Sequence, residues 1–254
     1  MSNIPLFDPS AQPSAGITRL YEYLELFSEG DPPRNSLFIL GRPTLAEQNP
    51  LQAAPDQLLI VDPPTDITAR FRLDGQVAVL GTGNLGDVGL AQLQTEAGGI
   101  AHIRIGTHYL DVYSQRHGNI VHLPALGIIC GGSFGSASNV PTVGPDSDGE
   151  EELGTLRLLA QLVKSRHFQM YIPRHGAVVQ ERLMAMQQLA ADVAYLHEIR
   201  RVLTGLVVRG ESEEVIETIA ATLLPAQRTA AESMVIHQEN LQRIYKALGA
   251  RPEE

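Results

Sequence analysis

The chain has 254 residues, a formal net charge of −10 at pH 7 and 43% hydrophobic residues, which is enough apolar material for one large core or two modest ones. The acidic balance argues against a surface for nucleic acid or anionic membranes, because either would need clustered lysine and arginine. The sequence has no uninterrupted apolar run of about 18 residues, as a membrane-spanning helix requires. We therefore expect a globular protein with neither a nucleic-acid partner nor a membrane span.

The N-terminal residues and the single cysteine bear on the cellular compartment. Residues 1–16 are rich in Pro, Ser and Gly and carry neither a positive leader nor an apolar segment, so we expect a flexible arm and no secretory signal. Cys130 excludes an intramolecular disulfide and lies in a strand-like run, where a buried, inert thiol is expected. These features predict a cytoplasmic protein.

Short apolar runs bounded by turn residues dominate the first third of the chain and predict strands. The last two are linked through Asp74-Gly75, a strong hairpin signal. The predicted strands cover residues 20–27, 36–40, 58–62, 68–73 and 76–80, and a short helix is the alternative for residues 20–27.

The rest of the chain mixes helices and strands. Residues 131–149 are rich in Gly and Ser and too long for an ordinary connection, which indicates a site-facing loop or a mobile lid. We expect residues 17–210 to form the main domain, with the helices of residues 211–254 packed on it or on a partner. Helices are predicted over residues 90–97, 150–165, 178–206, 213–223 and 225–248, and strands over 101–106, 119–123, 126–130 and 168–172.

A Gly-rich turn follows the strand at residues 76–80. Gly81, Gly83 and Gly86 have the spacing of a dinucleotide fingerprint, in which missing side chains let the backbone approach a pyrophosphate at a helix N-terminus. That mechanism also needs an acidic residue about 20 residues later, at the end of the next strand. Here the first carboxylate after that strand is Asp111. A nucleotide-binding module is therefore one alternative for this turn.

The second interpretation of the turn is a resemblance to a known family. Residues 82–89, Thr-Gly-Asn-Leu-Gly-Asp-Val-Gly, are similar to the Thr-His-x-His-x-Asp-His-x-Gly turn of the metallo-β-lactamase superfamily. Gly83, Leu85 and Val88 stand at the positions of the metal-binding histidines, and Asp87 is retained.

Residues 35–40, and residues 58–62 with their terminal Asp62, are similar to the opening strands of the family's fold, and three later segments complete a resemblance over about residues 30–210. Residues 114–119 are similar to the family's Gly-His-Thr-x-Gly segment, with Gln115 at the ligand histidine. Residues 127–133 are similar to its Gly-Val-Leu-Phe-x-Gly-Asp strand end, with Ser133 in place of the metal-bridging Asp. Ile172-Pro-Arg-His-Gly176 resembles its Pro-Gly-His-Gly segment and retains His175.

The resemblance implies an α/β fold, a four-layer αββα sandwich with two sheets face to face, helices outside and a site at the sheet edges. A hydrolytic zinc ion needs about three ligands and an open position for water, and most of the ligand positions are replaced, so we expect no metal or other cofactor. If zinc or another transition metal binds, Asp87, His117 and His175 are its candidate ligands. The implied vestigial pocket is lined by Gly83, Leu85, Asp87, Val88, Gln115, Ser133 and His175.

The remaining histidines and the last helix leave alternatives open. His102, His108, His117 and His122 lie in or beside two predicted strands, so they form either a replacement metal site or locally hydrogen-bonded strand and turn residues. An apolar stripe in the last helix packs on its own domain or forms a homodimer interface. The stripe consists of Ala230, Met234, His237, Leu241, Ile244 and Leu248.

These patterns lead to one functional prediction and two alternatives. We predict a non-catalytic binding or scaffold protein, a pseudoenzyme with an eroded metal site, which binds an unknown protein or small molecule. The first alternative is a hydrolase with a rearranged or metal-free site. Ser133 as its nucleophile is disfavoured, because the surrounding residues lack a Gly-x-Ser-x-Gly elbow. The second alternative is the nucleotide-binding module.

Overall fold

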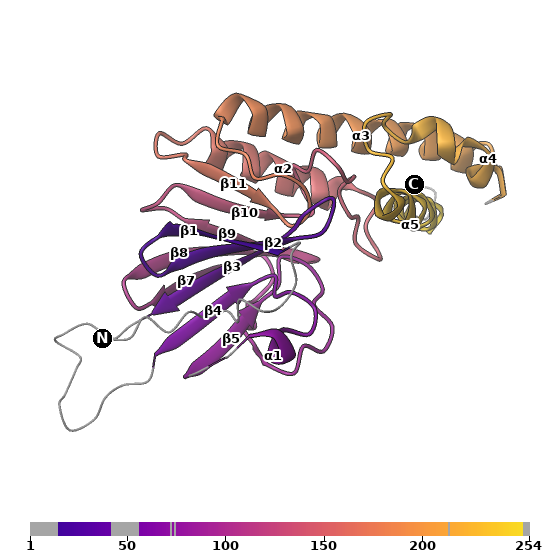
Figure 1. Cartoon of the computed structure of the whole chain (residues 1–254). Coiled ribbons are helices and arrows are strands. Elements are labelled where there is room, and N and C mark those ends of the chain that lie inside the picture. Colours follow the sequence, from indigo (N-terminus) through magenta and orange to yellow (C-terminus); the bar gives the residue numbers. More distant parts are fainter. Residues whose placement is uncertain (1–14, 42–55, 72, 74, 213, 251–254) are drawn as a thin grey trace, which may run out of the picture. The chain divides into compact units, whose positions relative to one another are not determined.

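The computed structural model describes residues 15–41, 56–71, 73, 75–212 and 214–250. The chain divides into two units, residues 1–126 and 127–254. The N-terminal unit holds most of the strands, and the C-terminal unit holds the long helices (Figure 1). Up to residue 14, the expected N-terminal arm lies outside the described residues, and the first strand begins at Ala15.

A mixed sheet of six strands forms much of the N-terminal unit, and its strands lie side by side in sequence order. The first four strands are antiparallel neighbours, whereas the fifth pairs parallel with the fourth and the sixth. The strands predicted at residues 36–40, 58–62 and 76–80 are confirmed. The sheet consists of β1 (Ala15–Tyr21), β2 (Leu24–Glu29), β3 (Arg34–Gly41), β4 (Gln57–Val61), β5 (Gln76–Leu80) and β6 (Ala91–Gln92).

The single strand predicted over residues 20–27 is wrong, because the chain turns in its middle. β1 ends at Tyr21, β2 begins at Leu24, and the two strands pair antiparallel. Tyr23 in the turn has a φ of 63°. This turn could not be recognised in the sequence, because residues 20–24 contain neither Gly nor Pro, the residues that usually mark a turn.

The strand predicted over residues 68–73, with its hairpin to β5, is also wrong. Ile67–Arg70 form the short helix α1. Ile67 and Phe71 are only 2% and 6% exposed, and both belong to one apolar cluster. A spacing of four residues places them on the same face of a helical turn, but so short an apolar run is equally typical of a strand.

The helix predicted over residues 90–97 is wrong as well. Ala91–Gln92 form β6 instead, and the Leu93 amide donates to the Val79 carbonyl at 2.8 Å. Gly86 and Gly89 both have a φ of +66°, a conformation that does not belong to a helix. The segment after the Gly-rich turn therefore bonds to the edge of the sheet.

Three antiparallel strands complete the N-terminal unit: β7 (Ile100–Ile105), β8 (His108–Gln115) and β9 (Gly118–Leu123). β7 and β9 are confirmed, whereas β8 was not predicted. Its buried residues alternate, as Leu110, Val112 and Ser114 show, and this is the period of a half-buried strand.

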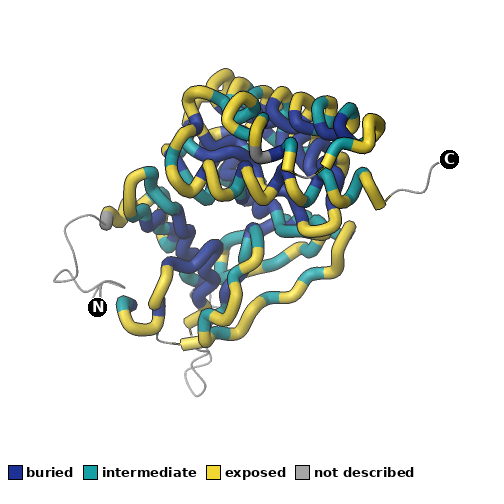
Figure 2. Tube along the Cα trace, turned by 90° about the vertical axis from the view of Figure 1, so that its right-hand side faces the viewer, coloured by how far each residue is buried: buried dark blue, intermediate teal, exposed yellow. Residues whose placement is uncertain are grey.

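The C-terminal unit contains a parallel strand pair, a long loop and four helices. Its strands and helices agree with those predicted, and Cys130 is a buried free thiol. Figure 2 shows buried and exposed segments alternating along the helices, as expected for helices with one face on a core. The elements are β10 (Ile128–Gly132), paired parallel with β11 (Met170–Pro173), and α2 (Glu150–Val163), α3 (Arg182–Val208), α4 (Glu214–Leu223) and α5 (Ala231–Gly249).

The apolar stripe of α5 is largely used within this unit. His237, Leu241 and Ile244 are at most 2% exposed, and α5 packs against α3 and α4. Met234 remains 46% exposed. Homodimerisation through this helix stays a prediction.

Candidate functional site

The Gly-rich turn of residues 82–89 is anchored at its start by Asp62, which directly follows β4. Both carboxylate oxygens of Asp62 bind Thr82: one accepts the Thr82 amide at 2.9 Å and the other accepts the Thr82 hydroxyl at 2.5 Å. The Ser36 hydroxyl donates to the Asp62 carbonyl at 2.6 Å, and Asp62 is only 4% exposed. The resemblance singled out Asp62 as the Asp that ends an apolar strand, but its bonds to Thr82 were not predicted.

Farther along, the turn is closed by its own side chains. The Asn84 side-chain oxygen accepts the Gly86 amide at 3.0 Å, and the Asp87 carboxylate accepts the Gly89 amide at 2.9 Å. Such bonds to an amide two residues ahead are typical of Asn and Asp in turns. Asp87, the residue retained from the resembled motif, therefore serves the backbone of the turn.

Leu85 and Val88 occupy positions at which the resembled family has histidines. Both are partly buried and pack against the apolar cluster on the first sheet. Gly81 permits this tight turn, because a Cβ there would lie 2.4 Å from the Gly83 carbonyl oxygen and 2.6 Å from Leu85 Cγ. The turn thus contributes apolar side chains to a core. The buried members of the cluster are Phe27, Phe38, Leu58, Ile60, Ile67, Phe71 and Val79.

The segment that contains Gln115 and His117 leads directly into residues 118 and 119, which lie beside the turn. The Asn119 side chain donates to the Gly81 carbonyl at 2.8 Å, and its backbone amide donates to the Thr82 carbonyl at 3.2 Å. A Cβ on Gly118 would lie 2.2 Å from that Thr82 oxygen. Gln115 ends β8 and His117 lies in the tight turn between β8 and β9.

The C-terminal unit holds the other two predicted site residues in neighbouring loops. Ser133 Oγ accepts the Thr142 amide at 3.2 Å. His175 Nδ1 lies 3.7 Å from a carboxylate oxygen of Glu232 at the start of α5, and the His175 side chain is 18% exposed. The Arg174 amide donates to the Gly132 carbonyl at 2.7 Å, which keeps the His175 loop beside the end of β10.

Residues 133–149, between β10 and α2, are fastened along their length by buried side chains. The Asn240 side chain on α5 donates to the Pro141 carbonyl at 2.7 Å and accepts the Val143 amide at 2.8 Å. The Glu152 carboxylate accepts the Gly144 amide at 2.8 Å. Side chains of α2 and α5 thus bond to the loop backbone, an arrangement that does not favour the mobile-lid interpretation.

A buried ion pair holds the start of the same loop. Asp192 on α3 is fully buried and pairs with Arg228, and its second oxygen accepts the Gly135 amide at 2.6 Å. Burial raises the pKa of Asp192 to about 6, although the Arg228 guanidinium and the Gly135 amide oppose this rise. None of these residues was singled out from the sequence, because they are far apart in the chain and belong to no motif.

Two of the remaining histidines flank one aspartate across three neighbouring strands. His102, Asp111 and His122 lie opposite one another across β7, β8 and β9. His102 Nδ1 lies 2.7 Å from one Asp111 oxygen, and His122 Nδ1 lies 4.0 Å from the other. Burial lowers the pKa of His122, and the charge of Asp111 opposes that shift.

The turn does not fit the metal that the family resemblance implies. Asp87 binds a backbone amide, and Leu85 and Val88 pack on the sheet. In the part of the chain that the structure describes, no three His, Cys, Asp or Glu residues are placed to hold a metal ion.

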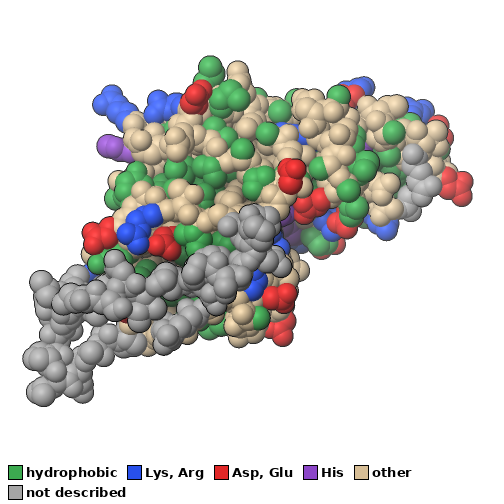
Figure 3. All heavy atoms as spheres, viewed as in Figure 1, with side chains coloured by type: hydrophobic (Ala, Val, Ile, Leu, Met, Phe, Trp, Pro, Cys, Tyr) green, Lys and Arg blue, Asp and Glu red, His purple; other side chains and the backbone are tan. Residues whose placement is uncertain are grey.

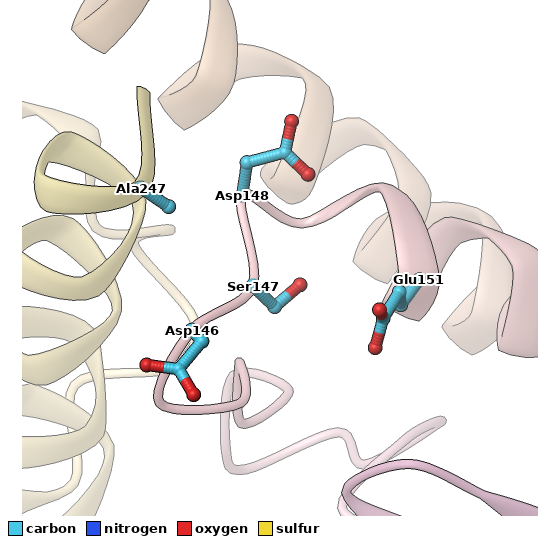
Figure 4. Close-up of a pocket in the computed structure, with 5 residues that line it drawn as sticks. All are labelled: Asp146, Ser147, Asp148, Glu151 and Ala247. Carbon is cyan, nitrogen blue, oxygen red and sulfur yellow. The ribbon is translucent and has the colours of Figure 1, made fainter. Parts of the chain in front are cut away.

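One small acidic hollow of about 170 Å³ lies between α2 and α5 in the C-terminal unit. Its carboxylates point away from one another in Figure 4, and Asp148 pairs with Arg200 at 3.2 Å. This arrangement does not converge on a ligand. The lining residues are Asp146, Ser147, Asp148, Glu151 and Ala247.

Solved structures with the same fold are known. Neither a family model nor a curated protein sequence matches this chain. A beta-lactamase domain protein from Burkholderia ambifaria aligns over 94% of this chain and 90% of its own, with a TM-score of 0.54 and 12% identity. A metallo-beta-lactamase family protein from Thermus thermophilus aligns over 88% and 94%, with a TM-score of 0.56 and 13% identity. The chain therefore has the α/β fold of the metallo-β-lactamases, as predicted.

The described helices include none that is long and apolar enough to cross a membrane. On the face drawn in Figure 3, acidic and basic side chains are interspersed over the region of α3, α4 and α5.

Proposed function

We propose that this metallo-β-lactamase-fold protein acts by binding a protein or small-molecule partner and not by metal-dependent hydrolysis. The observation that carries the proposal is the packing of Leu85 and Val88 against the apolar cluster of the first sheet. At these two positions the turn supplies core side chains where the resembled motif supplies ligands. An apolar side chain offers no lone pair to a cation, so a metal there would lack its donors.

The anchoring of the turn supports the same proposal. Asp62 binds Thr82 with both carboxylate oxygens, and Asn119 binds the carbonyls of Gly81 and Thr82. The turn is therefore held in place by interactions that need no metal. A site whose scaffold is retained without its ligands is suited to recognition of another molecule.

The first test is the metal content of protein purified without chelator and without a metal-affinity tag, measured by inductively coupled plasma mass spectrometry. We expect far less than one equivalent of metal, unchanged after incubation with zinc, manganese or iron. Near-stoichiometric binding of a transition metal would contradict the proposal. The variants Asp87→Ala, His117→Gln and His175→Gln would then show which side chains hold the ion, and the hydrolase with a rearranged site would become the working hypothesis.

The nucleotide-binding alternative loses its structural basis at one point. A dinucleotide fingerprint uses a helix N-terminus to hold the pyrophosphate, and residues 81–99 of this chain contain β6 and turns instead. We expect no shift of the melting temperature with adenine nucleotides at millimolar concentration, whereas binding would raise it. The cytoplasmic location stays a prediction.

A further inference from the structure

A basic surface lies at the end of α2 in the C-terminal unit, although the chain as a whole is acidic. Residues 153–180 contain lysine, arginine and histidine but neither Asp nor Glu. Lys164 directly follows α2, and Arg166 and His167 lie in the turn that leads from α2 to β11. All three residues are exposed.

The start of α3 lies against the same turn. The Arg182 side chain donates to the Ser165 carbonyl at 2.7 Å, which keeps a further cation beside this turn. Figure 3 shows Lys and Arg side chains and a histidine gathered at the upper left of the view, with an acidic side chain beside them, where α2 ends and α3 begins in Figure 1. We call Lys164, Arg166, His167 and Arg182 the basic patch.

The basic patch has no carboxylate partner among the residues that the structure describes. None of its side chains forms an ion pair with these residues, and Arg182 binds a backbone carbonyl instead. Glu181 precedes Arg182 in the sequence, yet the two side chains are not paired. Farther along α3, by contrast, the exposed Arg201 lies 2.6 Å from a carboxylate oxygen of Glu198. The charges of the patch are therefore available to another molecule.

Helix dipoles do not explain the patch. The dipole of α2 favours a cation at Lys164, which is the C-cap of that helix. Arg166 and His167 lie beyond the helix, where this effect has fallen off. Arg182 begins α3, and a positive charge is disfavoured at the N-terminus of a helix. Most of the patch thus gains nothing from the helices that carry it.

The turn that presents the patch is fixed by the core below it. Phe168 is only 7% exposed, and the Gln169 amide donates to the Gly127 carbonyl at 2.9 Å. The Lys164 amide donates to the Ala160 carbonyl at 3.1 Å. Charged side chains on a fixed backbone lose less conformational entropy on binding than those on a flexible loop.

Exposed apolar side chains border the patch. Leu183 and Met184 follow Arg182 in the first turn of α3 and are 68% and 44% exposed. Cations beside apolar side chains suit a protein segment that carries both carboxylates and apolar residues. A nucleic acid or an anionic membrane would bring many negative charges close to a chain of net charge −10, whereas a short acidic segment brings few.

We propose that the basic patch is a docking surface for an acidic segment of a partner protein. The carboxylates of that segment pair with Lys164, Arg166 and Arg182, and its apolar side chains cover Leu183 and Met184. The proposal rests on the proposed function in one respect, that the protein acts by binding, and it adds the chemistry of the partner. It does not depend on the turn of residues 82–89, which lies in the other unit.

Fluorescence anisotropy of a labelled peptide of glutamates with interspersed leucines, titrated with the intact protein at low ionic strength, tests this surface. We expect binding that weakens as salt is added, because ions screen exposed charges. The double variant Lys164→Glu/Arg166→Glu should weaken binding by about tenfold or more. The same peptide with glutamine in place of every glutamate should not bind.

The matched control is the double variant Arg201→Glu/Arg209→Glu, which changes the net charge equally at exposed positions outside the patch. It should leave the affinity within about twofold, and thermal denaturation checks that both double variants remain folded. Equal weakening in the two variants overturns the proposal, as does an unaltered protein that does not bind the peptide. Binding to phosphatidylserine and phosphatidylcholine vesicles without peptide binding overturns it in favour of a membrane surface.

The failure of this proposal can be told apart from the failure of the proposed function. Metal-free protein that does not bind the peptide contradicts the role of the basic patch alone. Protein that contains near-stoichiometric metal and binds the peptide through Lys164 and Arg166 contradicts the proposed function alone.

Discussion

The turn of residues 82–89 and the loop that begins at Ser133 both include positions that the family resemblance aligns with metal ligands, but the two segments are held in different ways. The turn is held by bonds from within its own unit's sheet and by the apolar contacts of Leu85 and Val88. The loop is held by polar and charged side chains that come from α2, α3 and α5. A segment without metal ligands can thus be fixed by apolar packing or by a buried polar network. Substitutions in the two segments should therefore lower the free energy of unfolding by different amounts.

The largest effect is expected when the buried ion pair of the loop is broken. Arg228→Ala leaves the Asp192 carboxylate in the core without its partner, and we expect the free energy of unfolding at pH 7 to fall by about 3–5 kcal/mol. The loss should be smaller near pH 5, where Asp192, with a pKa of about 6, is largely neutral. Chemical denaturation at both pH values measures this.

The matched control for Arg228→Ala is Arg201→Ala. Arg201 also pairs with a carboxylate, at 2.6 Å from Glu198, but its side chain is 70% exposed. We expect no measurable change in stability, because exposed pairs contribute little. An equal fall in the free energy of unfolding in the two variants would show that burial of the Asp192–Arg228 pair does not increase its contribution to stability.

A smaller effect is expected at the turn, where two aspartates differ in burial. Asp62→Ala leaves the amide and hydroxyl of Thr82 without their acceptor, so the free energy of unfolding should fall by about 2 kcal/mol. Asp87→Ala removes an exposed turn bond and should change it by about 0.5 kcal/mol or less. Thermal and urea denaturation measure both. A larger loss for Asp87→Ala would mean that this carboxylate has a role outside the turn.

The smallest effect concerns pH and His122. Burial lowers the pKa of His122 in the folded protein, so between its ordinary value near 6.5 and the lowered value the unfolded chain binds more protons. The stability that His122 contributes is therefore present above about pH 6.5 and is lost as pH falls through this window. His122→Gln should show a shallower loss of stability over the same pH range, and an unchanged pH profile would contradict this assignment.

The sequence predicted the fold class and most elements, and the reasons for its errors are physical. The helices α2, α3 and α5 carry a periodic apolar face over several turns, and a pattern of this length can be recognised in the sequence. Two errors fall on the short elements α1 and β6, where one or two contacts decide the conformation. Ile67 and Phe71, for example, lie in a stretch whose four residues of helix look much like an alternating apolar run. The turn between β1 and β2 and the whole of β8 were missed in longer elements.

The candidate site could be predicted in part only. The resemblance singled out the turn and the segment of residues 114–119, and Asn119 of that segment bonds to the turn. The pocket that the resemblance implies stays a prediction. The residues that hold these segments could not be predicted, because each bonds to a residue distant in the sequence. Asn240 and Asp192 bond to amides of the loop, and Arg228 pairs with Asp192. Such pairs become visible only when the helices are in place.

The close approach of Gly118 to the Thr82 oxygen has a consequence for how such sequences can diverge. A Cβ at this position would lie 2.2 Å from that oxygen, so natural variation at position 118 should be restricted to glycine wherever Asn119 keeps its bonds to the turn. The exposed positions 84 and 87 carry no such steric limit. Relatives that share this turn would thus be recognised by Gly118 and Asp62 sooner than by any residue on its surface.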